Sequence, residues 1–171
     1  MERKMDMNRA VNDLAGVLER QIANYHELKT LVLEERKAIV TNDLKKLAEV
    51  TAKIQSLVSA NNQLEMGRVS LVKRLAAVLK FPNPKPTLAD IANRLERPLS
   101  DKLLSLRRQA LEAISEMQRQ NRINSEMLKY CANLMDSVLK QLVEPEPRQA
   151  VYGRTGEKRK AASASLLDRH V

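Results

Sequence analysis

The sequence is poor in aromatic residues and in glycine. Its 171 residues include no tryptophan, one phenylalanine, three tyrosines and four glycines. Aromatic and β-branched residues pack the faces of sheets, and glycine-rich loops hold nucleotide phosphates. The shortage therefore excludes a many-stranded sandwich or barrel and a nucleotide-binding α/β domain. Apolar residues still make up 43% of the chain, enough for a core of Leu, Ile, Val, Ala and Met, and this composition predicts long helices.

Cysteine, histidine and long apolar runs are scarce as well. The single cysteine, Cys131, rules out an internal disulfide framework and a cysteine-based zinc site, and the two histidines lie far apart in the sequence. No metal or other cofactor is expected. The first residues are charged, and no run of about 18 uncharged apolar residues could cross a bilayer. We therefore expect a cytoplasmic protein without stable membrane insertion.

The net charge of +9 raises the alternative of a basic helical nucleic-acid-binding protein. Acidic and basic residues are mixed along most of the chain, and the nearest approach to a basic block is Lys158-Arg159-Lys160. Few aromatic side chains are present to stack on bases. We therefore expect no nucleic-acid partner, and the nucleic-acid reading stays an alternative.

The first half of the chain has the apolar spacing of two long helices. From Met7 to Val40, apolar residues recur at intervals of three, four and seven, which predicts an amphipathic helix with two neighbours. Thr41-Asn42-Asp43 offers N-cap residues, so a break or a kink is expected there. A second helix is predicted from Leu44 to about Lys80. Its seven-residue spacing indicates coiled-coil-like packing along Val50, Leu57, Leu64, Leu71 and Val78.

A proline-rich corner over residues 81–86 ends this pattern. Thr87-Leu88-Ala89-Asp90 then has the form of a capping box and predicts a short helix to about Leu95. A third long helix is expected from about Ser100 to Val143, because seam positions recur every three or four residues at Leu103, Leu106, Ala110, Ile114, Met117, Asn121, Asn124, Leu128, Cys131, Met135, Val138 and Leu142. The predicted fold is all-α: an elongated antiparallel bundle of three long helices plus one short helix.

Some of these seam positions are polar or carry sulfur. Asn121 and Asn124 should either pair inside the core and fix the register, or face a partner-binding surface. Burial is expected for Cys131 rather than a role as a nucleophile. The methionines of this helix are likewise predicted in the core, namely Met117, Met127 and Met135.

Residues 144–171 differ in composition from the helices. Prolines at 145 and 147 end the helical pattern, and the rest contains small, polar and basic residues. Two apolar pairs, Val151-Tyr152 and Leu166-Leu167, resemble segments that become ordered on a partner. We therefore expect a helical domain over residues 1–143 and a mobile C-terminal tail over residues 144–171.

No catalytic constellation is found in the sequence. Gly153-Arg154-Thr155-Gly156 lacks the Gly-Lys-Ser/Thr ending of a phosphate-binding loop and does not lie between a strand and a helix. Paired carboxylates such as Glu34-Glu35 belong to a charged helical face. The chain is therefore not expected to be an enzyme. A structural coiled-coil adaptor that self-associates weakly through its seams is a further alternative.

The order of several short motifs resembles the FlgN family of flagellar export chaperones. They are Glu34-Glu35-Arg36-Lys37-Ala38-Ile39, Asp43-Leu44 with Leu47, Gly67-Arg68, the Thr87-Leu88 restart, the paired-asparagine segment from Asn121 to Leu128, and Val151-Tyr152-Gly153-Arg154-Thr155-Gly156 in the tail. The resemblance spans nearly the whole chain. Each motif alone is common in helical proteins, and the similarity lies in their order and spacing.

This resemblance implies a cytoplasmic type III export chaperone that keeps the hook-associated proteins FlgK and FlgL soluble and unassembled and delivers them to the export gate without using ATP. It implies that the client's C-terminal helical segment binds within residues 121–171, and that Tyr152 engages the export-gate protein FlhA. The partner-binding residues predicted on this basis are Asn121, Asn124, Met127, Leu128, Val151, Tyr152, Leu166 and Leu167.

Overall fold

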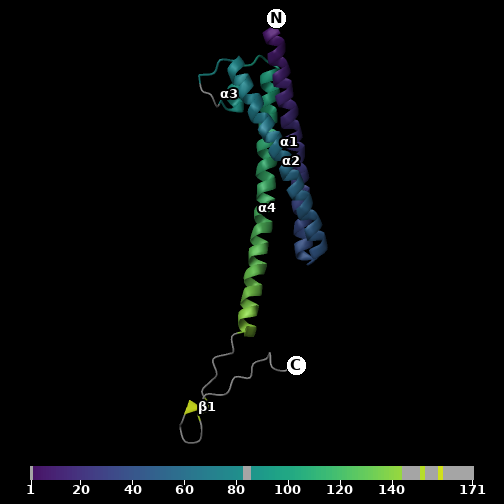
Figure 1. The fold of residues 1–171 in the computed structure, drawn as a ribbon, viewed down its shortest axis with the longest axis vertical. Coiled ribbons are helices and arrows are strands. Elements are labelled where there is room, and N and C mark those ends of the chain that lie inside the picture. Colours follow the sequence, from purple (N-terminus) through teal and green to yellow (C-terminus); the bar gives the residue numbers. More distant parts are fainter. Residues whose placement is uncertain (1, 83–85, 144–150, 153–157, 160–171) are drawn as a thin grey trace. The chain divides into compact units, whose positions relative to one another are not determined.

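The computed structural model describes residues 2–82, 86–143, 151–152 and 158–159. Four helices account for nearly all of them: α1 (Glu2–Val40), α2 (Leu44–Val78), α3 (Leu88–Ala92) and α4 (Leu99–Val143) (Figure 1). The predicted all-α class, with three long helices and one short helix, is confirmed. Two strands of two residues each, β1 (Val151–Tyr152) and β2 (Lys158–Arg159), form an antiparallel pair that the sequence pattern did not predict.

The connection between α1 and α2 is the turn expected at residues 41–43. It is short enough that the two helices pack against each other as an antiparallel pair (Figure 1). Asp43 is the N-cap of α2, since its carboxylate accepts a hydrogen bond from the backbone N–H of Lys46 at 2.9 Å. Asn42 has a φ of 52°, a conformation that asparagine tolerates better than most residues.

The helix α3 begins at the predicted capping box. The Thr87 hydroxyl accepts from the N–H of Asp90 at 3.2 Å, and the Asp90 carboxylate accepts from the N–H of Thr87 at 2.7 Å. The helix ends at Ala92, three residues before the predicted Leu95. The backbone tightens there, because the N–H groups of Arg94 and Leu95 donate to carbonyl oxygens three residues earlier.

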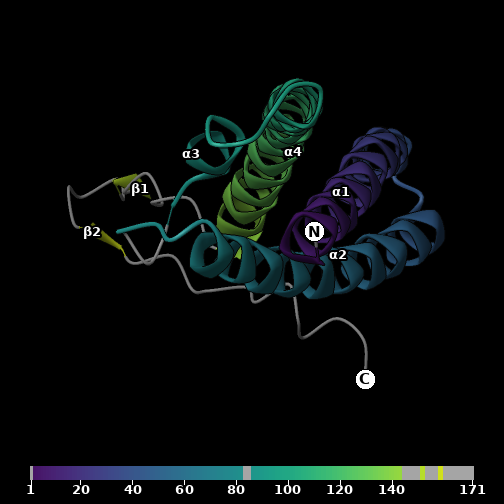
Figure 2. The ribbon, with the colours of Figure 1, turned by 90° about the horizontal axis from the view of Figure 1, so that it is seen from above.

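Two compact units divide the chain, residues 1–128 and residues 129–171. The first unit has a continuous apolar core to which all four helices contribute, with Leu14, Leu75, Ile91 and Leu103 each 0% exposed. Figure 2 shows α3 beside the first turns of α4, where it covers this end of the core. The core is aliphatic, as the scarcity of aromatic residues requires.

Burial along α4 changes in the middle of the helix. Leu103, Leu106, Ala113 and Asn124 are buried, whereas every side chain from Leu128 to Leu142 is exposed. The Arg36 side chain of α1 bonds to Asn124 of α4. Val40, the last residue of α1, lies four residues after Arg36, and Leu128 lies four residues after Asn124. Within the first unit, α1 therefore ends alongside Leu128, where burial of α4 ends.

The predicted burial of the last seam residues of α4 is accordingly wrong. Cys131, Met135, Val138 and Leu142 are exposed rather than in the core. A period of three and four residues shows that a helix has an apolar face, but it does not show that the same chain covers that face. An apolar face of this length left in water is a candidate for binding a partner.

Candidate helix-binding site

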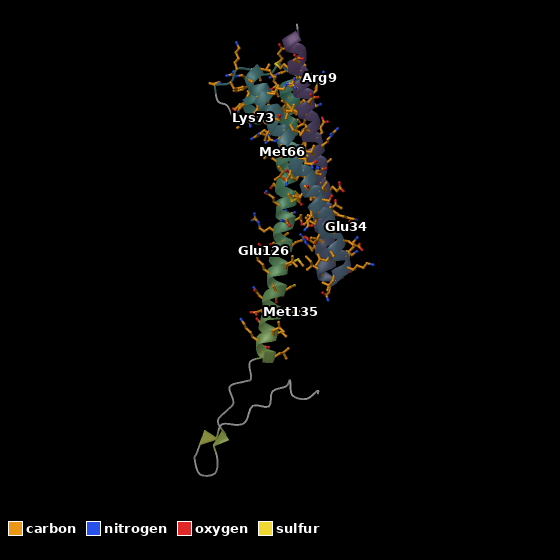
Figure 3. All side chains as sticks on the ribbon, viewed as in Figure 1. Arg9, Glu34, Met66, Lys73, Glu126 and Met135 are labelled. Carbon is orange, nitrogen blue, oxygen red and sulfur yellow. The ribbon has the colours of Figure 1, made fainter. Side chains whose placement is uncertain are left out.

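The exposed part of α4 has one uncharged apolar face, which we call the α4 face. Met135 lies on it (Figure 3) and is 67% exposed, and Leu142 is 70% exposed. At 3.6 residues per turn, the apolar side chains fall within an arc of about 160°. They are Leu128, Cys131, Ala132, Leu134, Met135, Val138, Leu139 and Leu142. Fully burying one leucine against a partner contributes about 1.5–3 kcal/mol, so the face can support substantial binding.

The opposite side of the same segment is polar. It carries Lys129, Asn133, Asp136 and Lys140, and the Asp136 carboxylate forms an ion pair with Lys140 at 2.8 Å. Exposed pairs of this kind contribute little to stability. The helix is therefore strongly amphipathic where it is exposed, which is the pattern of a helix whose apolar side binds other helices.

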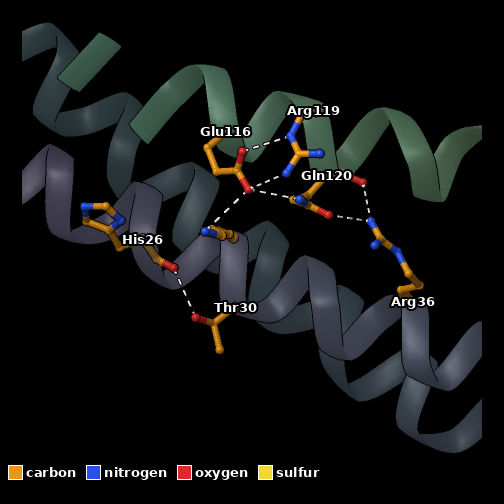
Figure 4. A network of polar contacts seen from close by, with 7 residues as sticks. His26, Thr30, Arg36, Glu116, Arg119 and Gln120 are labelled. Atoms are coloured by element: carbon orange, nitrogen blue, oxygen red, sulfur yellow. Dashed lines mark hydrogen bonds and ion pairs between the residues drawn. The ribbon is translucent and has the colours of Figure 1, made fainter. Parts of the chain in front are cut away.

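A partly buried polar cluster connects α1 to α4 just before the α4 face begins. We call it the polar clamp, and it consists of Glu35 and Arg36 of α1 with Gln120 and Asn124 of α4. The Arg36 guanidinium donates to the Asn124 side-chain oxygen at 2.9 Å, to the Gln120 side-chain oxygen at 2.8 Å and to the Gln120 carbonyl at 3.1 Å (Figure 4 shows its contacts with Gln120). All three acceptors lie on α4, so one side chain of α1 holds a full turn of α4.

The Asn124 amide group completes the polar clamp. Its Nδ2 donates to the carbonyl of Val32 at 2.7 Å and to the Glu35 carboxylate at 2.8 Å. With its oxygen accepting from Arg36, the side chain has hydrogen bonds on both ends although it is only 1% exposed. Buried amides that are fully bonded fix one arrangement of neighbouring helices, because any shift breaks several bonds together.

Glu116 extends this network one turn towards the start of α4. Its carboxylate accepts from Arg119 at 2.9 and 3.0 Å and from the Gln120 amide at 2.9 Å, and it lies 3.4 Å from the Lys29 ammonium of α1 (Figure 4). The hydrogen bonds from Arg119, followed by that from Gln120, lower the pKa of Glu116 from 4.5 to about 2. The carboxylate therefore remains ionised under most conditions.

Acid titration is expected to show this depressed pKa directly. A group with a lowered pKa in the folded state stabilises the fold above its ordinary pKa of 4.5, and this contribution is lost as the pH falls through about 2. NMR titration of the Glu116 carboxyl carbon should give a midpoint near pH 2, and Arg119→Gln should move it towards 4.5. An unchanged midpoint in the Arg119 variant would contradict the assignment of the cause.

The structure separates the two asparagines that the pattern placed on one seam. Asn124 is buried and paired inside the core, but Asn121 is exposed, so core pairing is wrong for Asn121, and its position on a partner-binding surface stays a prediction. The inward position belongs to Gln120, which is 7% exposed and bonds to Arg36. Met127 is partly buried and Leu128 is 43% exposed, at the beginning of the α4 face.

The predicted tail residues are only partly described. Val151 and Tyr152 form β1, with Val151 opposite Arg159 and Tyr152 opposite Lys158 in β2. Leu166 and Leu167 lie outside the described residues. The binding roles predicted for these four residues and for Asn121, Asn124, Met127 and Leu128 remain predictions.

Two residues of the polar clamp, Glu35 and Arg36, were not predicted to have a role. The sequence contains a signal for Arg36, because it lies four residues after Val32 and three before Ile39, on the inward face of α1. A charged residue at such a position requires a polar partner on the neighbouring helix. Asn124 and Gln120, two buried polar residues of α4, are those partners.

A hollow of about 350 Å³ lies within the first unit between α1, α2 and α4. Its lining includes Gln21, Glu65 and Arg68, and the Glu65 carboxylate accepts from Arg68 at 2.6 and 2.7 Å and from Gln21 at 3.1 Å. The bond from Arg68 lowers the pKa of Glu65. These groups already bind one another, so the hollow is a weaker candidate site than the α4 face.

Metal sites and membrane-spanning helices are both absent from the part of the chain that the structure describes. Among the side chains that the structure describes, no cluster of His, Cys, Asp and Glu is arranged to hold a metal ion. No described helix combines the length and the apolar character needed to span a bilayer.

The fold and the α4 face define a class, that of all-α proteins in which a long helix leaves an apolar face exposed. Comparison with known families shows to which family the chain belongs. The family model described as FlgN protein matches residues 5–160, and the chain belongs to the FlgN family of flagellar export chaperones, as its motifs predicted. No curated protein and no solved structure matches the chain.

Proposed function

We propose that this protein is the cytoplasmic chaperone of hook-associated proteins, FlgK and FlgL, and that it delivers them unassembled to the export gate. The observation that carries the proposal is the α4 face in a member of the FlgN family. A hook-associated client whose terminal helices have apolar faces would self-associate if they were exposed. Covering those faces with the α4 face keeps the client soluble.

Release is as important as capture for an export chaperone. Ordering the client's helices on the α4 face costs conformational entropy, which offsets part of the free energy gained by burying leucines. The resulting affinity is moderate, so the client can be handed on without ATP. Membership in a chaperone family agrees with a role in which binding alone does the work.

We further propose that the segment containing β1 is the contact with the export gate, FlhA. Its sequence combines an aromatic residue, Tyr152, with basic residues at 154 and 158–160, in a chain with only three tyrosines. Tyrosine is enriched among the residues that dominate interface energies. On this proposal client and gate use different parts of the chain, so both can be bound during delivery.

Pull-downs with purified client and the cytoplasmic domain of FlhA test this division. The full chain should bind both, and a chain truncated after residue 147 should keep the client but lose FlhA. Tyr152→Ala in the full chain should weaken FlhA binding about thirtyfold, since an interface aromatic contributes about 2 kcal/mol.

Tyr130→Ala is the matched control for this experiment, because Tyr130 is a tyrosine on α4 that is 70% exposed. It should leave FlhA binding unchanged. If the truncated chain binds FlhA as well as the full chain does, the tail has no part in gate recognition. If the full chain binds neither FlgK nor FlgL, the chaperone proposal itself is wrong.

A further inference from the structure

The α4 face is wider than one partner helix can cover. Its central line runs through Leu128, Cys131, Met135, Val138 and Leu142. To one side lie Ala132 and Leu139, and to the other lies Leu134, so both flanks of the central line are apolar. Leu139 is 58% exposed and Leu134 is 53% exposed. In a two-stranded coiled coil the partner covers the central line, and the two flanking positions are normally charged.

We propose that the α4 face binds two helices of its client side by side, one on each flank, and thereby completes a three-helix bundle. This inference rests on the proposed chaperone function. A single helix seated on the central line would leave Leu134 or Leu139 in water. Two helices cover both flanks, as in bundles where each helix has two neighbours.

The borders of the α4 face distinguish the two client helices. Beyond the Leu139 flank lie Lys129, Asp136 and Lys140, while beyond the Leu134 flank lie the uncharged Tyr130, Ser137 and Gln141. Because Asp136 is paired with Lys140, the first border retains the positive charge of Lys129. The client helix on that side is therefore expected to carry acidic residues, and the other helix is expected to be uncharged along its edge.

The same borders favour a client over further copies of this chain. In a bundle of three α4 segments, the Lys129 border of one copy would lie against the Tyr130 and Gln141 border of the next. No opposite charges would meet there. The net charge of +9 also opposes self-association.

Photo-crosslinking in the full-length complex with purified client tests the inference. A photoreactive amino acid at position 134 and one at position 139 should each crosslink to the client, and peptide mapping should place the two crosslinks in different client helices. Asn133, in the middle of the polar side, serves as the control position and should give no crosslink. Crosslinks from both positions to one client helix would overturn the proposal.

Affinity measurements give a second, independent readout. Leu134→Asp and Leu139→Asp should each weaken client binding at least tenfold, and Lys129→Glu should weaken it several-fold and reduce its salt dependence. A loss confined to one of the two leucine variants would show a single bound helix. Client binding that is unaffected by Lys129→Glu would show that the client helix on that side has no acidic edge.

A wild-type chain that binds no client would instead refute the proposed function, so the two failures are distinguishable. Sedimentation of the free chain as a trimer would assign the α4 face to self-assembly and overturn the proposal.

Discussion

Replacing Met135 and Leu142 together by glutamate is expected to weaken client binding by a hundredfold or more without lowering the melting temperature. Each substitution places a carboxylate where the client's apolar side chains would lie, and desolvating a polar group without a partner costs about 1–3 kcal/mol. Two such costs add to about 2–6 kcal/mol, which is roughly thirtyfold in affinity at the low end and more than a hundredfold over most of the range. Both side chains are about two-thirds exposed in the free protein, so the fold loses no buried contact.

Isothermal titration with purified client and a thermal melt of the free chain are the two measurements. Asn133→Glu is the matched control, because it adds the same carboxylate to the same exposed stretch of helix on the side opposite the α4 face. It should leave the affinity within about twofold of wild type. An equal loss in the control would indicate a nonspecific charge effect, and an unchanged affinity in the double variant would show that the client binds elsewhere.

Local features of this fold could be predicted from the sequence because neighbouring residues produce them. The turn before α2 depends on Asp43 and the backbone three residues later, and the start of α3 depends on Thr87 and Asp90 alone. The length of α4 followed equally from an apolar period that continues to Leu142. None of these requires knowledge of which helices meet.

Which parts of α4 are covered could not be predicted in the same way. The apolar period is the same on both sides of Asn124, but burial depends on where α1 ends relative to α4. In the turn before Asn124, the buried polar residue is Gln120, whereas the sequence pattern pointed to Asn121. Apolar residues three and four apart leave two or three candidate positions per turn, and only the position of α1 decides among them. The short pairing of β1 with β2 has too few residues for an alternating pattern.

Burial divides α4 into a part that packs in the core and a part that the core does not cover. Up to Asn124 the helix is part of the core of the first unit, and from Leu128 it exposes the α4 face. The side chains of the α4 face are exposed, so substitutions there are expected to leave the core intact. Substitutions in the polar clamp act on the packing of α4 against α1. The two sets of variants should therefore give opposite results. Variants of the α4 face should lose client binding and keep their stability, whereas variants of the polar clamp should lose stability first.

Replacing Asn124 by leucine is expected to destabilise the protein by about 3 kcal/mol. The substitution leaves the Val32 carbonyl without its hydrogen bond from Asn124 and removes one acceptor of the Arg36 guanidinium. Each polar group left unpaired in a buried site costs about 1–3 kcal/mol, more than the added apolar surface returns. Urea denaturation followed by circular dichroism measures the change in the free energy of unfolding.

Asn121→Leu provides the control, since it is the same substitution one turn earlier at an exposed position. It should change the free energy of unfolding by no more than about 0.5 kcal/mol. If Asn124→Leu instead stabilises the protein, the buried amide is merely tolerated, and the polar clamp does not hold α4 to α1. If both variants destabilise equally, the loss comes from leucine itself and not from the hydrogen bonds of Asn124.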